Sequence, residues 1–293
     1  MANTIRHKRG TSDPAASDFS ETAELLVNTT DGGLFTKTDG GSVVEIGGGG
    51  LPNNATGTNS LGIGTNALDS ETTGSNNIAI GTSALTTNDE GENNIAFGFR
   101  ALRDNTTGTN NIAIGPSALI VNTAGSHNQA FGYQALYTNN TGDKNVAIGS
   151  SALQLNVSGS NNVAIGRRAL YSNTTAIYNT AVGSNALYSA TTGGGNTATG
   201  YQALYSNTTS GDNQAYGWNA QYSNTTGTRN VAIGNDSLYT NTTGGGNIAI
   251  GHDTLYSNAT GIRNVAIGEE ALKVSTTSYN IAVGYRALYS NTT

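Results

Sequence analysis

The chain has 293 residues, 40 of them glycine, with 3 prolines, no cysteine, 11% charged residues and a formal net charge of −6. The absence of cysteine excludes disulfides and thiolate metal sites. Scattered Lys and Arg on an acidic chain argue against a nucleic-acid partner. Residues 1–27 lack the apolar core of a signal peptide, and no stretch approaches the roughly 20 apolar residues of a membrane helix. We therefore expect neither membrane insertion nor the general secretory route.

The first part of the chain carries the pattern of a small β module followed by a linker. Strand-like runs at 25–29, 34–38 and 43–46 are separated by two Asp-Gly-Gly turns, which is typical of an antiparallel meander. A sheet this small is marginal by itself and would be steadied by docking or trimerisation. We assign residues 1–46 to this module and residues 47–59, which include four consecutive glycines, to a linker.

Residues 60–293 form a sequence repeat marked by a glycine. Thirteen marker glycines stand 17 residues apart, and a fourteenth follows after 16 residues. They are Gly64, Gly81, Gly98, Gly115, Gly132, Gly149, Gly166, Gly183, Gly200, Gly217, Gly234, Gly251, Gly268 and Gly284. An insertion in one coil would shift all later coils out of register, so a period this strict predicts a stack of equal rungs.

Each repeat predicts two short strands and two turns. The segment Asn-(Ile/Val)-Ala-(Ile/Val)-Gly alternates β-branched and small residues, as a strand with two unlike faces does. Ala-Leu-Tyr-Ser-Asn is interpreted as a second extended run, and Thr-Thr-Gly as a turn. A 34-residue helix-pair repeat is disfavoured because Gly, Asn, Thr and β-branched residues lower helix propensity. We predict an all-β fold, a parallel β-solenoid or β-roll of fourteen coils, in a rod of roughly 65 Å.

The two faces of the first strand receive different assignments. We expect the Ile/Val pair, together with the Leu four residues after the marker glycine, to fill the narrow interior. The alanine between them excludes bulk in every coil, which indicates that another backbone lies close. That backbone is either the opposite strand of the same coil or a neighbouring chain around a three-fold axis. A homotrimer is favoured, because association buries apolar surface that one thin coil cannot.

An asparagine stands four residues before every marker glycine from the second copy on. At one fixed position in stacked coils, these side chains are expected to form a ladder of amide hydrogen bonds that stiffens the shaft. The ladder comprises Asn77, Asn94, Asn111, Asn128, Asn145, Asn162, Asn179, Asn196, Asn213, Asn230, Asn247, Asn264 and Asn280.

Aromatic residues gather at two repeat positions. Tyrosines five residues after the marker, continuous from Tyr171 to Tyr256, either stack on one another or present rings to sugars of a cell surface. A second set directly follows the marker, where exposure is expected. The candidate surface-contact residues from both sets are Trp218, Tyr201, Tyr133, Tyr285, Tyr188, Tyr205 and Tyr222.

The sequence offers no catalytic constellation. His127 and His252 fall at different repeat positions and His7 lies outside the repeat, so we predict no metal site, no cofactor and no enzyme. Acidic residues in turns could pair across coils for polysaccharide hydrolysis, but no spacing selects a pair. These residues are Asp143, Asp212, Asp236, Asp253, Glu269 and Glu270.

Two resemblances sharpen these expectations. The segments 145–150 and 162–167, Asn-Val-Ala-Ile-Gly followed by Ser or Arg, resemble the repeat in the heads of trimeric autotransporter adhesins. That resemblance implies a left-handed parallel β-roll, three chains side by side, that binds host surfaces. The longer unit at 200–209 resembles repeats in bacteriophage tail fibres, notably those of cyanophages. Segments 8–14 and 24–41 resemble the N-terminal module that joins many phage fibres and tailspikes to the particle.

Together these features predict a structural fibre on the surface of a virion. Its N-terminus would attach to tail, collar or capsid proteins, and its trimeric shaft would contact a host glycan or protein. The alternatives are a tailspike that degrades polysaccharide and a bacterial trimeric surface adhesin.

Overall fold

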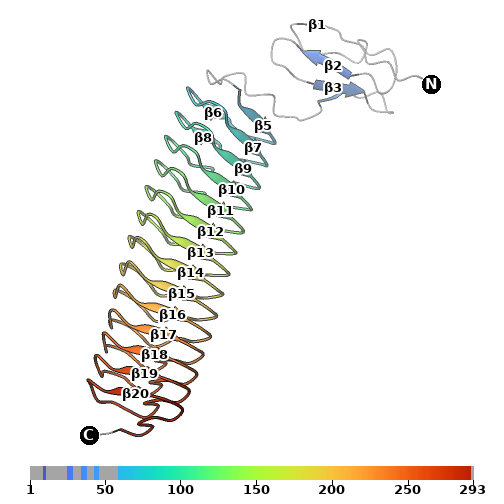
Figure 1. Ribbon diagram of the computed structural model, residues 1–293. Helices are drawn as coiled ribbons and strands as arrows, with labels where there is room; N and C mark the ends of the chain where they lie inside the picture. The colour runs from blue at the N-terminus through green and yellow to red at the C-terminus, as the bar shows by residue number, and fades with distance from the viewer. Residues whose placement is uncertain (1–8, 11–24, 29–33, 38–42, 46–58, 292–293) are drawn as a thin grey trace, which may run out of the picture.

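The computed structural model describes residues 9–10, 25–28, 34–37, 43–45 and 59–291 (Figure 1). These residues form strands, bends and turns without a helix, so this part of the chain is all-β, as predicted. None of it could therefore cross a membrane as a helix.

The N-terminal residues form a four-stranded sheet in the order β1-β2-β3-β4. Strands β2 (Leu25–Asn28), β3 (Leu34–Lys37) and β4 (Val43–Glu45) fall on the three predicted runs and pair antiparallel. Strand β1 (Arg9–Gly10), which the sequence did not indicate, pairs parallel with β2. Both Asp-Gly-Gly turns and almost all of the predicted linker lie outside the described residues.

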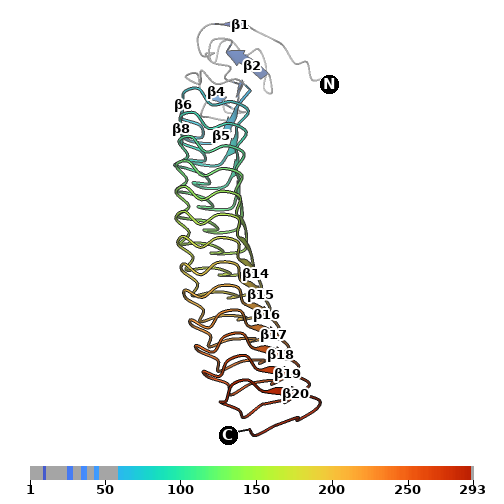
Figure 2. The same cartoon turned by 60° about the vertical axis from the view of Figure 1, so that its left-hand side comes forward.

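The repeat forms a parallel β-solenoid of about 13 turns whose main sheet has 14 strands (Figure 1). Each strand pairs in register with the equivalent strand of the next coil, alanine opposite alanine. In Figure 2, strands β14 to β20 run along one side of the stack and turns along the other. The strands are β5 (Leu61–Ile63), β7 (Ile78–Ile80), β9 (Ile95–Phe97), β10 (Ile112–Ile114), β11 (Gln129–Phe131), β12 (Val146–Ile148), β13 (Val163–Ile165), β14 (Thr180–Val182), β15 (Thr197–Thr199), β16 (Gln214–Tyr216), β17 (Val231–Ile233), β18 (Ile248–Ile250), β19 (Val265–Ile267) and β20 (Ile281–Val283).

The predicted orientation of the strand is wrong. The alanine at the centre of each strand is buried, whereas the flanking Ile and Val residues face outward and are half-buried or exposed. The cause is the thinness of the coil. A Cβ on Gly62, which takes the alanine position in the first coil, would lie 2.9 Å from the carbonyl oxygen of Ala67. The opposite side of the same coil therefore leaves no room for a side chain at Gly62 and holds only a methyl group at the buried alanines of the later coils. The backbone near alanine is that of its own chain.

The core consists of this alanine together with a second alanine and a leucine on the opposite side of the coil. The leucine four residues after the marker is fully buried in twelve coils, from Leu68 to Leu272, with the position occupied by Gln221 in one coil. This placement confirms the prediction that leucine fills the interior. The apolar core of a typical coil is only two alanines and one leucine, so the stack depends on contact between coils.

The second predicted strand is also wrong in most coils. Only β6 (Ser70–Glu71) and β8 (Thr87–Asn88) form there, followed by isolated bridges at Asp104 and Val121. The residues two and four after each marker are left-handed, as at Leu170 with φ of 50°. Left-handed backbone disfavours leucine, but the Leu170 amide donates to the carbonyl of Ala186 in the next coil at 2.9 Å. Inter-coil hydrogen bonds thus stabilise a compact turn in place of a strand.

The marker glycine is required by two independent constraints. Gly149 has φ of +132°, and a Cβ there would lie 2.6 Å from the carbonyl oxygen of Gly166 in the next coil. Backbone conformation and inter-coil contact both exclude a side chain, so the strict recurrence of this glycine follows from the stacking itself.

Candidate surface-contact sites

The asparagine ladder forms as predicted and joins every coil to the next. At Asn162, Oδ1 accepts the backbone N–H of Asn179 at 3.0 Å. Its Nδ2 donates to the carbonyl of Ala176 at 2.8 Å and to Oδ1 of Asn145 at 3.2 Å. From Asn77 to Asn264 these side chains are fully buried. The ladder therefore provides hydrogen-bond partners for buried turn backbone that water cannot reach.

A second buried asparagine ladder, seven residues after the marker, was missed because this asparagine was interpreted as the last residue of the second extended run. Asn122 donates from Nδ2 to Oδ1 of Asn105 at 2.7 Å and to the carbonyl of Gly125 at 2.8 Å. Where Ala190 interrupts the row, Oδ1 of Asn173 is left buried without a partner. The fixed position of the asparagine was the signal that could have identified it.

Glu71 begins this second ladder in the first coil, where it accepts a hydrogen bond from Asn88 of the next coil. Its Oε1 accepts hydrogen bonds from Ser60 Oγ at 3.0 Å and Asn77 Nδ2 at 2.6 Å. The side chain is buried, so one carboxylate oxygen serves both asparagine rows at the start of the stack.

The tyrosines five residues after the marker stack on one another. From Tyr171 to Tyr256, consecutive rings lie 5.1–5.2 Å apart with interplanar angles of 4–8°. Loss of water, followed by the neighbouring Tyr188 and Tyr222, raises the pKa of Tyr205. Three predicted contact residues, Tyr188, Tyr205 and Tyr222, are thus half-buried members of a continuous stack, and stacking is the interpretation that the geometry supports.

The aromatic residues directly after the marker are exposed. Trp218 is 57% exposed and its ring lies 5.2 Å from that of Tyr201, tilted by 58°. Tyr133 and Tyr285 are also exposed, but they lie in distant coils. Of the predicted contact residues directly after the marker, the structure therefore brings together Trp218 and Tyr201, and the stacked Tyr188, Tyr205 and Tyr222 form a separate group.

The outer face of the main sheet is a further surface that sequence reasoning assigned to the interior. Ile and Val on either side of the buried alanine line this face, and Ile114, Ile148 and Ile233 are 38–41% exposed. Gln129 of β11 interrupts this face, and a longer interruption lies at β14 to β16, beside Trp218 and Tyr201. The residues of the longer interruption are Thr180, Thr197, Thr199, Gln214 and Tyr216. Long exposed apolar strips of this kind mark interaction surfaces.

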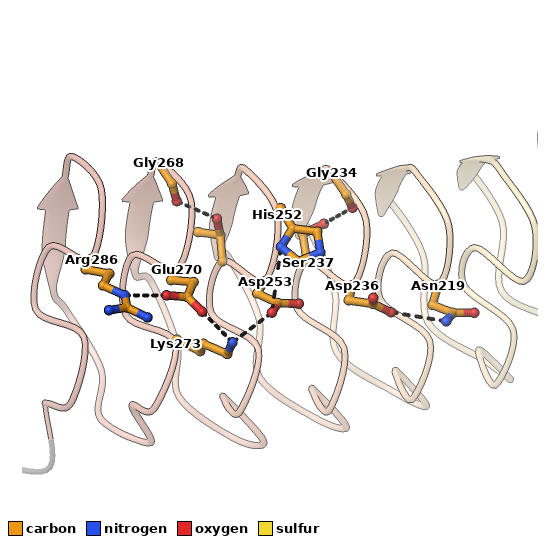
Figure 3. A network of polar contacts seen from close by, with 11 residues as sticks. Asn219, Gly234, Asp236, Ser237, His252, Asp253, Gly268, Glu270, Lys273 and Arg286 are labelled. Carbon is orange, nitrogen blue, oxygen red and sulfur yellow. Dashed lines mark hydrogen bonds and ion pairs between the residues drawn. The ribbon is translucent and has the colours of Figure 1, made fainter.

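A polar strip runs along the residues two after the marker near the C-terminal end (Figure 3). Lys273 donates from Nζ to Asp253 Oδ2 at 2.8 Å and to Glu270 Oε1 at 2.7 Å, and Arg286 pairs with Glu270 from the next coil. These hydrogen bonds, from Lys273 first and Arg286 second, lower the pKa of Glu270. The bonds to Asp253 and Glu270 raise the pKa of Lys273. Lys273 occupies the repeat position that carries tyrosine in the preceding coils.

Comparison with protein-family models, with curated proteins and with solved structures finds no match to this chain. The functional interpretation therefore depends on the surfaces described above and on the resemblances in the sequence.

Proposed function

We propose that this chain is the structural protein of a bacteriophage-like virion fibre. Residues 1–46 join it to other virion proteins, and the solenoid projects as a homotrimeric shaft that contacts the host surface. The observation that carries the proposal is the apolar strip of Ile and Val along the outer face of an unbroken stack of coils. A monomer would expose this strip to water along its whole length.

The proposed trimer contact differs from the one expected from the sequence. Alanine lies inside each coil, so the surface left for neighbouring chains is the Ile/Val strip. Three such strips around one axis would bury apolar area that the thin core lacks. In-register strands and the asparagine ladders stiffen each chain along the axis. A shaft that transmits force needs this stiffness.

Host contact is assigned to the neighbourhood of Trp218. Trp218 and Tyr201 form an exposed aromatic pair, and the polar interruption at β14 to β16 lies beside them. Weak contacts repeated on three chains add through avidity. The phage assignment itself rests on the resemblances of segments 8–14, 24–41 and 200–209.

The test is to locate the protein. Antibodies against residues 59–291 should label a fibre on purified particles in electron micrographs. Label confined to a bacterial outer-membrane fraction would instead support the adhesin alternative and refute the virion assignment.

The polysaccharide-cleaving alternative has one feature in its favour, the carboxylates of Asp236, Asp253 and Glu270 in successive coils. Lys273 pairs with Asp253 and Glu270, so two of these carboxylates are engaged in ion pairs. Release of reducing ends from host polysaccharide, abolished by Asp236→Asn, would support this alternative over adhesion.

A further inference from the structure

Asp236, His252 and Asp253 form a set of metal-ligand side chains on two successive coils (Figure 3). One potential ligand atom from each residue lies within 4.8 Å of those of the other two. We propose that these three side chains bind one divalent transition-metal cation of the Zn²⁺ type, which joins the coil of Gly234 to the coil of Gly251. The sequence did not indicate this site, because the residues come together only when the coils stack.

The backbone holds the two aspartates in equivalent places. Both are left-handed, with φ of 54° at Asp236 and 53° at Asp253. The Asp253 amide donates to the carbonyl of Asn235 at 3.1 Å, which fixes one coil against the other. Zinc binds nitrogen and oxygen ligands at about 2.0–2.2 Å in tetrahedral geometry, so two donors on one ion lie about 3.3–3.6 Å apart. Small side-chain rotations would bring the three ligand atoms to these distances.

On this polar strip the carboxylates outnumber the cationic groups. Three carboxylates, those of Asp236, Asp253 and Glu270, face two cationic groups, Lys273 and Arg286. Within residues 59–291, Asp236 has no cationic partner, and its Oδ1 accepts a hydrogen bond from Nδ2 of Asn219 at 3.1 Å. A bound cation would supply the missing positive charge.

Lys273 limits the affinity of the site without blocking it. Its Nζ contacts Oδ2 of Asp253, the oxygen that also lies 3.7 Å from His252 Nδ1, whereas Oδ1 of that carboxylate makes no hydrogen bond within residues 59–291 and would take the metal. The nearby ammonium repels a cation, so removing it should tighten binding.

The donor set selects the class of metal. An imidazole nitrogen with carboxylate oxygens suits Zn²⁺ and its transition-metal neighbours, whereas Mg²⁺ and Ca²⁺ prefer oxygen donors alone. Three protein ligands leave a coordination position for water. A metal that binds both coils only when they are stacked would stabilise the folded solenoid.

The experiment is calorimetric titration of the full chain, produced without a histidine tag, with zinc chloride. We expect one Zn²⁺ per chain, and we expect His252→Ala and Asp236→Asn each to weaken the affinity by at least about tenfold. His127→Ala is the matched control and should bind as the wild type does, because His127 lies in a distant coil. Lys273→Met should bind more tightly.

His252 is exposed, so its variant should fold, and an unchanged melting temperature without metal checks this. With zinc, the melting temperature should rise for the wild type and for His127→Ala but not for His252→Ala. The proposal is overturned if the wild type takes up no zinc, or if His252→Ala binds zinc as tightly as the wild type. In the second case the ion lies elsewhere on the chain.

Discussion

Replacing Asn162 by alanine should open the solenoid locally where this side chain joins its coil to the next. The substitution removes the acceptor of the buried Asn179 N–H. It also removes the donor of the shorter of the two hydrogen bonds to the Ala176 carbonyl. A buried donor without a partner costs about 1–3 kcal/mol, and a lost hydrogen bond costs about 1 kcal/mol more. We expect a total loss of about 2–4 kcal/mol, which corresponds to about 30-fold to 700-fold more frequent opening.

Hydrogen–deuterium exchange read by mass spectrometry is the appropriate assay, because repeat proteins open locally. Amides in 162–196 should exchange faster in Asn162→Ala, while amides in 248–283 should keep their wild-type rates. Asn161→Gly is the control: Asn161 is exposed and left-handed at φ of 58°, a conformation that glycine adopts freely. Unchanged exchange in Asn162→Ala, or an equal acceleration in Asn161→Gly, would refute the structural role of the ladder.

Three further substitutions test the core, the turn and the ion pairs. Gln221→Leu should raise the unfolding free energy by about 1–2 kcal/mol in chemical denaturation, because it restores the leucine column and removes a buried Oε1 without a partner; a loss of stability would contradict this. Gly149→Ala should lower the melting temperature sharply, since its Cβ would collide with the Gly166 carbonyl at a φ that alanine disfavours, and an unchanged melting temperature would count against the stacking. Glu270→Gln should melt below the wild type at pH 7. The pKa of Glu270 is lowered on folding, so its contribution is present above the ordinary value of 4.5 and is lost as the pH falls through the folded value. The two melting temperatures should therefore converge in acid, and a constant difference between them would show that the ion pairs are not its cause.

The register of the fold was predictable from the sequence because a single rule governs every coil. A constant period forces equal rungs, and a fixed asparagine implies that each amide meets its equivalents above and below. The Asn162 ladder is the direct result. The same reasoning applied to Asn122 would have identified the second ladder, whose asparagine was assigned to a second strand on local composition alone.

The alternation of residues in the strand could not show which of its two faces is buried. Alternation shows that a strand has two unlike faces, but which face is inside depends on the thickness of the coil. The close approach of Gly62 to Ala67 and the buried alanines of the later coils show that the coil is too thin to enclose Ile or Val. The bulky Ile and Val residues, which usually mark a core, are consequently placed on the outer face.

The sequence failed to predict the compact turn and the polar strip for a different reason. A left-handed leucine such as Leu170 contradicts intrinsic preference and is stabilised only by a hydrogen bond from another coil. The proximity of Asp236 to His252 likewise arises between coils. Local sequence patterns carry little information on contacts that stacking creates.

The most direct test of the account is cryo-electron microscopy of the purified full-length chain. We predict three solenoids around a common axis, with the strips that contain Ile114 and Ile148 facing one another and alanine buried inside each chain. A single solenoid with these isoleucines exposed to solvent would contradict the proposed shaft.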